Sequence, residues 1–184
     1  DRAVKGVEYL KGHPFEITSF EQKEGKEGNP RLFDLTSLQV EGNKKFGFSA
    51  EDTLKYVQGL YEKKFVTYPR VDTTYLSEDL HPKIPNIMKG LTYYQRFTAP
   101  LMEKPIPKLK SVFDDKKVTD HHAIIPTGIQ PSGISQPESQ VYELIVRRFI
   151  AAFYPECKVS NTTVLGKVDQ IGFKATGKQI IEPG

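Results

Sequence analysis

The residues whose types and spacing best suit catalysis lie in one short stretch, residues 65–76. Pro69 fixes its own φ angle and pushes Tyr68 toward extended geometry. Because alternate residues of an extended segment share a face, Tyr68, Arg70 and Asp72 are expected to project together. A tyrosine oxygen can attack a phosphodiester covalently, and an arginine can clamp the phosphate oxygens. The spacing therefore indicates phosphoryl transfer, and the competing interpretation is a tyrosine that only packs, since the chain has nine.

A second stretch, residues 119–127, holds the adjacent histidines His121 and His122. One interpretation is a polar surface loop. A second, a metal site, is disfavoured because adjacent histidines on a strand point to opposite faces and chelate one ion poorly. In a third, one imidazole contacts the phosphate that Arg70 holds, as a donor or proton shuttle, while the other bonds structurally. The residues alone leave the first and third interpretations open.

The composition limits the class of protein. With 184 residues, 38% of them hydrophobic, the chain can form one domain or two small ones around a core. The formal net charge is +3, which does not by itself indicate nucleic acid, but several basic pairs on one face would make a groove that tracks phosphates. The basic pairs are Lys44 and Lys45, Lys63 and Lys64, Lys116 and Lys117, and Arg147 and Arg148.

The single cysteine, Cys157, excludes an internal disulfide and a multi-cysteine zinc site, and it fits a reducing compartment.

Helical periodicity dominates the middle of the chain. The best-signalled helix begins after the N-cap Ser49 and runs to about Lys63, directly before the Tyr68 stretch. Gly47 is expected to end the preceding helix in the left-handed conformation. Further helical segments are predicted over residues 1–12, 36–46, 77–90, 92–101 and 135–154. A helix followed by a short extended piece is a compact way to hold a functional side chain rigidly.

Alternation of period two marks the two ends of the chain. A strand is predicted over 15–20, followed by a charged loop over 21–30 and a return strand over 31–35. Alternation resumes near the end, with turns expected at Gly166 and Gly172. These segments are expected to pair in one small antiparallel sheet or barrel, from which the helical block projects. The predicted fold class is therefore α+β.

Five motifs follow one another along the chain. They are Leu32-Phe33-Asp34-Leu35-Thr36-Ser37-Leu38-Gln39, Phe46-Gly47-Phe48-Ser49-Ala50, Leu60-Tyr61-Glu62, Thr67-Tyr68-Pro69-Arg70 with Asp72, and Asp120-His121-His122-Ala123-Ile124-Ile125-Pro126-Thr127. Together they resemble the central part of a type IA DNA topoisomerase. The double histidine and the Tyr-Pro-Arg favour the topoisomerase III branch, and the resemblance runs from about Phe15 to Gly184.

The resemblance implies a role for each of these residues. In this family the tyrosine matching Tyr68 attacks a single DNA strand and holds its 5′ end as a phosphotyrosine. The arginine matching Arg70 contacts the scissile phosphate, and the histidine matching His121 lies close to it. Another strand passes through the gap, which is then resealed without ATP. The residues predicted to contact DNA are Arg70, Asp72, His122, Lys44 and Lys45.

The resemblance also divides the chain. Residues 36–157 would form the tyrosine-bearing helical domain, with a helix-turn-helix-like core. Residues 13–35 and 158–184 would form β segments of the arch over a central hole. Val71 stands where the family usually has threonine and Thr74 where a basic residue is common, and neither touches the presumed chemistry.

The family's acidic, magnesium-binding domain lies at its N-terminus, and its Asp-x-Asp motif does not occur in this sequence. The chain is therefore expected to be a fragment that carries the nucleophile but binds no metal, with Mg²⁺ serving the full-length enzyme. Its expected partners are single-stranded DNA and the rest of the same polypeptide, in a monomeric, cytoplasmic, nucleoid-associated protein without a membrane segment. The fragment alone is expected neither to cleave nor to relax DNA.

Two other functions are weighed against this one. A non-enzymatic helix-turn-helix module would read duplex DNA with a dependence on base sequence and would give Tyr68 no special role. A metal-dependent tyrosine nuclease is disfavoured, because such enzymes place one apolar residue between their metal-binding histidines, whereas His121 and His122 are adjacent.

Overall fold

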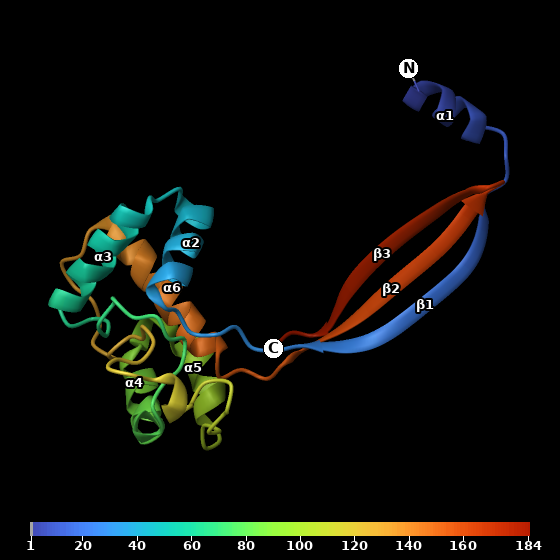
Figure 1. The fold of residues 1–184 in the computed structure, drawn as a ribbon. Coiled ribbons are helices and arrows are strands. Elements are labelled where there is room, and N and C mark those ends of the chain that lie inside the picture. The colour runs from blue at the N-terminus through green and yellow to red at the C-terminus, as the bar shows by residue number, and fades with distance from the viewer. Residues whose placement is uncertain (1) are drawn as a thin grey trace. The chain divides into compact units, whose positions relative to one another are not determined.

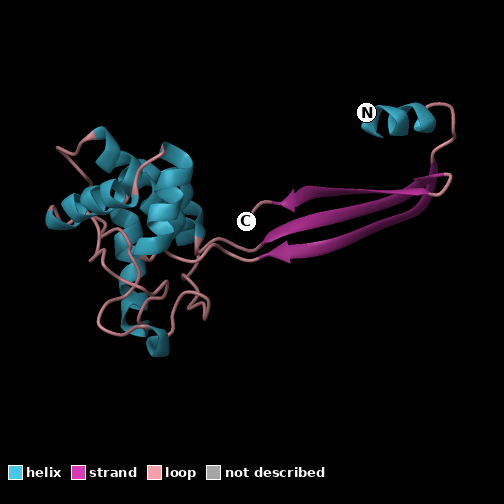
Figure 2. Ribbon diagram, turned by 45° about the horizontal axis from the view of Figure 1, so that its top comes forward, coloured by secondary structure: helices cyan, strands magenta, loops and turns pink. Residues whose placement is uncertain are grey.

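The computed structural model describes residues 2–184, which form two compact units (Figures 1 and 2). One unit combines the chain up to Gly28 with the chain from Pro155 onward, and the other is Asn29–Tyr154. The first is built mainly of antiparallel strands and the second of helices, so the predicted α+β class is confirmed. Residues 29–35, predicted to belong to the β domain, fall in the helical unit, because Leu32 and Phe33 are buried in its core.

The sheet has the order β1-β2-β3, with β1 (Glu16–Glu27) and β3 (Ile171–Glu182) both antiparallel to β2 (Cys157–Val168). Segments from both ends of the chain therefore pair, as predicted. The predicted loop over 21–30 and return strand over 31–35 are wrong. The charged residues of β1 stay paired with β2 as far as Glu27, since their side chains lie on exposed faces that tolerate charge. The helix α1 (Arg2–Leu10) precedes the sheet.

The predicted turns at Gly166 and Gly172 are also wrong. Gly166 lies inside β2, where a Cβ atom would overlap the ring of Phe15, so its small size serves packing. The chain turns instead between β2 and β3 at Asp169, whose φ angle of 52° is in the left-handed region that aspartate tolerates. Gly172 continues β3.

The helical unit begins and ends its elements largely where the sequence places its caps. Its elements are α2 (Leu35–Phe46), α3 (Ala50–Glu62), η1 (Glu78–Lys83), α4 (Ile84–Gly90), η2 (Thr92–Tyr94), α5 (Gln95–Met102), η3 (Asp115–Lys117) and α6 (Gln136–Ala151). Gly47 closes α2 with a φ angle of 72°, and the Ser49 hydroxyl accepts a hydrogen bond from the Asp52 N–H to start α3. Both predicted caps are present.

The core of the helical unit forms where α6 packs against α2 and α3 (Figure 1). Fully buried side chains from all three helices meet there, including Leu38, Leu60 and Phe149. Each such side chain contributes roughly 1.5–3 kcal/mol of transfer free energy, so this contact holds α3 firmly in place. Within residues 2–184, the helices are all too short or too polar to cross a membrane.

Candidate functional site

The Tyr68 stretch leaves the end of α3 through a sharp change of direction. Lys63 caps the helix, and Lys64 adopts a φ angle of 65°, which is unusual for a residue with a long side chain. The Thr127 hydroxyl donates to the Lys64 carbonyl at 2.7 Å and stabilises this turn. The chain then continues toward Tyr68, and the side chain of Phe65 is buried. The direction of the stretch is thus set by α3 and by the segment around Thr127.

Backbone hydrogen bonds join the two stretches that the sequence marks as chemical. The Thr67 N–H donates to the Ile125 carbonyl at 3.0 Å, and the Thr127 N–H donates to the Phe65 carbonyl at 3.1 Å. The Thr67 hydroxyl donates to the Ala123 carbonyl at 3.3 Å and accepts from the Ile125 N–H at 3.0 Å. These bonds bring the histidine pair beside Tyr68, although more than fifty residues separate them in the sequence.

Tyr68 lies between two other rings. The centroid of its half-buried ring is 4.5 Å from that of His121 and 5.4 Å from that of Tyr61, which meets it edge-on. Aromatic contacts of this kind fix the orientation of a ring. The structure therefore places the predicted pair of Tyr68 and His121 in direct contact.

Arg70 and Asp72 project from the surface beside Tyr68. The Val71 N–H bonds back to the Pro69 carbonyl at 3.0 Å, which makes a tight turn centred on Arg70. This turn interrupts the regular extended segment that the sequence predicts. Burial still alternates beyond it, since Arg70 and Asp72 are exposed while Val71 and Thr73 are buried.

Arg70 is exposed, and among residues 2–184 its guanidinium forms no ion pair with a carboxylate. Within residues 2–184 the arginines in ion pairs are Arg147 and Arg148. The Arg70 side chain is thus available to an external anion.

The second histidine plays a different structural part from the first. His122 is half-buried, and its Nδ1 lies 2.8 Å from the Ala123 carbonyl oxygen. Burial lowers the pKa of His122, so the ring is neutral near pH 7. In the neutral ring an Nδ1–H donates to the carbonyl, which leaves Nε2 as a hydrogen-bond acceptor.

The structure does not bring Lys44 and Lys45 to the same place. Both lie in the last turn of α2, and Lys45 forms an ion pair with Glu41 at 3.5 Å. The opposite end of α2 meets the Tyr68 stretch, where the Leu35 N–H donates to the Val71 carbonyl at 3.1 Å. Since α2 has 12 residues, its two ends are separated by roughly 18 Å.

A basic cluster around Tyr75 was not expected from the sequence. The Lys117 ammonium donates to the Tyr75 phenol oxygen at 3.0 Å, and the Arg31 guanidinium carbon lies 5.7 Å from the centroid of the same ring. The hydrogen bond from Lys117 lowers the pKa of Tyr75 and raises that of Lys117. The sequence shows Lys116 and Lys117 as a basic pair, but no pattern in it predicts that Arg31 lies near Tyr75.

The Mg²⁺ implied by the resemblance does not fit the residues present. Among residues 2–184, His, Cys, Asp and Glu side chains do not gather in any group of three or more that could hold a metal ion. Mg²⁺ requires near-octahedral oxygen ligands. The chemistry that this chain itself can provide is that of a phenol, a guanidinium and an imidazole.

Comparison with known proteins agrees with the motifs. Residues 1–184 match the family described as DNA topoisomerase. The chain belongs to the DNA topoisomerase family. It is similar to the DNA topoisomerase 3 of Bacillus thuringiensis (strain Al Hakam), with 40% identity over 189 residues that cover 100% of this chain and 26% of the relative. The DNA topoisomerase 3 of Bacillus subtilis (strain 168) is 36% identical over 180 residues, covering 95% of this chain and 25% of the relative.

The fold is also similar to that of a solved structure. Full-length topoisomerase I from Thermotoga maritima matches with a TM-score of 0.68 and 23% identity, over 98% of this chain and 30% of that one. The resemblance to type IA topoisomerases, and to their topoisomerase III branch, is confirmed by these matches. The chain spans about a quarter of the length of the curated relatives it matches.

Proposed function

We propose that this chain is the nucleophile-bearing part of a type IA DNA topoisomerase that cleaves and reseals single-stranded DNA. The observation that carries the proposal is Tyr68 itself, held against His121 and followed closely by the exposed Arg70. In the reaction the Tyr68 oxygen bonds to phosphorus while the bond from phosphorus to the deoxyribose 3′ oxygen breaks. The phenol loses its proton, and the departing 3′ oxygen gains one. The reverse transfer reseals the strand, so no ATP is required.

Arg70 would act on the negative charge that grows on the phosphate, and His121 on the proton that the phenol releases. The Arg70 guanidinium is suited to the phosphate oxygens, where negative charge grows as the phenol attacks. His121, whose ring lies on that of Tyr68, is suited to pass the phenol proton to solvent. Asp72 and His122 lie in the same two stretches and are proposed to contact the bound strand.

The remainder of the reaction would depend on other parts of a longer polypeptide. Support for this comes from the curated relatives, of which the chain covers about a quarter, and from the poor fit of Mg²⁺ to the described residues. The acidic domain of the full-length enzyme would supply Mg²⁺ and assist the leaving oxygen. We therefore propose that residues 1–184 alone bind single strands weakly but do not cleave them, in a monomeric, cytoplasmic enzyme associated with the nucleoid.

The decisive experiment traps the covalent intermediate. The longer polypeptide that contains these residues is incubated with a single-stranded oligonucleotide labelled at its 3′ end, and the reaction is stopped with detergent. A labelled protein band is expected for the wild type and for Tyr61→Phe, and no band for Tyr68→Phe. An undiminished band from Tyr68→Phe would overturn the proposal.

A second experiment separates this function from the helix-turn-helix alternative. Residues 1–184 are mixed at low salt with labelled single strands and with duplexes of several sequences. The proposal expects preference for the single strand with little dependence on sequence. Preference for one duplex sequence would favour the non-enzymatic module, and relaxation of supercoiled plasmid by residues 1–184 with Mg²⁺ would contradict the proposed inactivity of the fragment.

A further inference from the structure

The basic cluster of Arg31, Tyr75 and Lys117 has no part in the proposed transfer at Tyr68. The Lys117 ammonium lies 4.3 Å from the centroid of the Tyr75 ring, and the Arg31 guanidinium carbon lies 5.7 Å from the same centroid. Both cationic residues are exposed, whereas Tyr75 is buried. Like charges held against one ring repel each other, and an anion bound by both of them would relieve this repulsion.

The carboxylate beside the cluster leaves it positively charged. Lys117 forms an ion pair with Asp114 at 3.5 Å, and Asp114 also accepts a hydrogen bond from the Lys116 N–H at 3.1 Å as the cap of η3. The Arg31 guanidinium has no carboxylate partner within the described residues, 2–184. A net positive charge therefore remains, and a guanidinium and an ammonium are the groups that bind phosphate oxygens best.

The backbone that carries both cations is held in place by other side chains. The Arg148 guanidinium donates to the Arg31 carbonyl at 3.2 Å. The Thr73 hydroxyl donates to the Lys117 carbonyl at 2.6 Å, and its oxygen accepts from the Tyr75 N–H at 3.2 Å. The cluster is therefore preformed, and binding an anion in it costs little ordering of the protein.

Hydrogen bonds to one short segment, residues 123–125, join the cluster to the catalytic site. Its first residue donates from its N–H to the Tyr75 carbonyl at 2.9 Å, and its last accepts from the Thr67 N–H at 3.0 Å. Its middle residue donates to the carbonyl of Phe33, two positions after Arg31, at 2.8 Å. Because neighbouring extended segments lie about 4.8 Å apart, the backbone of the cluster lies on the order of 10 Å from that of the nucleophile. A DNA strand covers this distance within about three nucleotides, since each advances it by at least about 3.4 Å.

We propose that Arg31 and Lys117, aligned by Tyr75, bind a phosphate of the cleaved strand on the 3′ side of the scissile phosphate. The inference rests on the proposed function, in which Tyr68 holds the 5′ end of that part of the strand. That part remains attached to the helical unit after cleavage, whereas the other part ends in a free 3′ hydroxyl. A second contact about one to three nucleotides away would keep the attached part oriented for resealing.

The first test removes one charge of the DNA at a time. The cleavage site of an oligonucleotide is mapped with the longer polypeptide, and neutral methylphosphonates are then placed at successive positions on both sides of it. Binding is measured by fluorescence anisotropy with the Tyr68→Phe variant, so that cleavage does not interfere. At one position on the 3′ side the neutral group should weaken binding about tenfold, the scale of one charged hydrogen bond. In Tyr68→Phe combined with Lys117→Ala, the same position should lose this sensitivity, since the partner of that phosphate is gone.

The second test counts phosphate contacts from the salt dependence of single-strand binding by residues 1–184. Each phosphate neutralised on a single strand contributes about 0.7 to the slope of log K against log salt concentration. Lys117→Ala and Arg31→Ala should each reduce the slope by up to about that amount and weaken binding. Tyr75→Phe, which removes the hydrogen bond from Lys117 but keeps the ring, should weaken binding less. Circular dichroism checks that each variant is folded.

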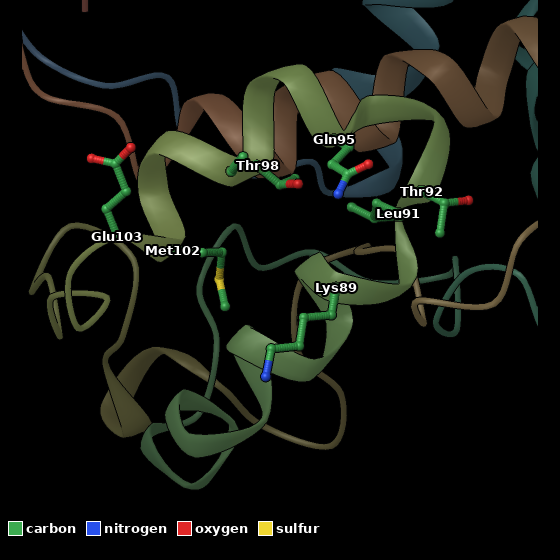
Figure 3. Close-up of a pocket in the computed structure, with 8 residues that line it drawn as sticks. Lys89, Leu91, Thr92, Gln95, Thr98, Met102 and Glu103 are labelled. Atoms are coloured by element: carbon green, nitrogen blue, oxygen red, sulfur yellow. The ribbon is translucent and has the colours of Figure 1, made fainter.

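Two residues of the same helical unit supply matched controls. Lys89 lines a hollow of about 330 Å³ between α4 and α5, together with other residues up to Glu103 (Figure 3). Arg96 is exposed and lies over an aromatic ring as Arg31 does, with its guanidinium carbon 4.4 Å from the centroid of Phe97. Lys89→Ala and Arg96→Ala should leave the affinity and the salt slope close to the wild-type values.

The outcomes separate this inference from the proposed function. Equal losses of affinity in the cluster variants and the two controls would overturn the inference, because that pattern reports general positive charge and not a site. Sensitivity to methylphosphonate on the 5′ side alone would overturn it as well. Neither result affects the proposed function, which depends on the covalent adduct of Tyr68. Conversely, an undiminished adduct from Tyr68→Phe would overturn the proposed function, even if the cluster still bound a phosphate.

Discussion

Two neighbouring rings, those of Tyr61 and His121, constrain the orientation of the Tyr68 ring, and the two differ in their chemistry. Tyr61 packs edge-to-face against Tyr68, whereas His121 packs on it at a tilt and carries an imidazole, the group most often used for proton transfer in catalysis. The motifs select Tyr68, Arg70 and His121 as candidate site residues, and they also predict that His121 lies near Tyr68, as the contact between the two rings shows. The basic cluster of Arg31, Tyr75 and Lys117 could not be predicted, since it exists only after folding.

Replacing His121 should slow chemistry without abolishing it. In the longer polypeptide, His121→Ala is expected to lower the rate of covalent adduct formation about a hundredfold, the usual scale for losing a proton-transfer group. Tyr61→Phe, which keeps the edge-on contact with Tyr68, serves as the control and should stay close to the wild-type rate. Single-turnover assays with a labelled single strand measure both. Equal rates for His121→Ala and the wild type would show that His121 only packs.

The buried histidine should make stability depend on pH. Because burial lowers the pKa of His122 below its ordinary 6.5, the unfolded chain binds the proton more readily than the folded one. Its stability contribution is therefore full above the unfolded value and falls as pH drops through the folded pKa. The hydrogen bond to the Ala123 carbonyl and the charge of Asp79 oppose this lowering of the pKa, while His121 and Lys83 add to it.

His122→Asn tests this dependence. The variant should lose less of its melting temperature than the wild type when pH is lowered from about 7.5 to about 5, across the range in which an ordinary histidine titrates. The comparison uses the difference between the two pH values, so a general loss of packing in the variant does not affect it. An identical acid-side decline in both proteins would assign the effect to other groups.

At the scale of elements, the sequence specifies helix ends better than strand ends. The caps Gly47 and Ser49 are local signals, and both occur as caps in the structure. Gly166 is misleading because its small size accommodates the ring of Phe15, a contact between distant residues that no local pattern reveals. Strand ends depend on pairing, and the pairing partner of β1 lies more than a hundred residues away.

The junction of α3 with α6 depends on one carboxylate. Glu138 accepts hydrogen bonds from the Ser135 N–H at 2.7 Å and from the Lys63 ammonium at 2.8 Å, so it caps α6 and bonds to the last turn of α3. Burial raises the pKa of Glu138, but these donors together outweigh it and the net shift is downward. Gly59 allows this approach, since a Cβ there would come within 2.7 Å of the carboxylate.

Glu138→Ala should therefore destabilise the helical unit. We expect a loss of about 1–2 kcal/mol, most of it from the cap, because the ion pair with half-exposed Lys63 is screened by solvent. Lys63→Ala is the matched control and should cost less than about 1 kcal/mol. Urea unfolding followed by circular dichroism gives both values. A larger loss in Lys63→Ala than in Glu138→Ala would show that the ion pair, and not the cap, stabilises the junction.

At the scale of the whole molecule, burial is divided unequally between the two units. The main hydrophobic cluster lies entirely between Leu32 and Phe153, inside the helical unit. The sheet, by contrast, leaves large apolar side chains such as Ile17, Phe20 and Ile180 exposed. A sheet without a core to pack on is marginally stable. Folding should therefore be driven by residues 29–154. A helical domain that begins at residue 36 would lack the core residues Leu32 and Phe33.

Two truncated chains test this division directly. Residues 29–154 retain Leu32 and Phe33 in the core, and they retain Asn29, whose amide donates to the Ala152 carbonyl at 3.1 Å at the end of α6. Residues 36–157, the helical domain that the sequence predicts, lack all three. The first chain should unfold in one cooperative transition. The second should be less stable by several kcal/mol or fail to fold, since losing one large buried side chain costs about 2–5 kcal/mol.

Thermal unfolding by circular dichroism and calorimetry compares the two chains. Equal stability would show that residues 29–35 contribute nothing to the core, and a 29–154 chain without a cooperative transition would show that the helical unit depends on the sheet.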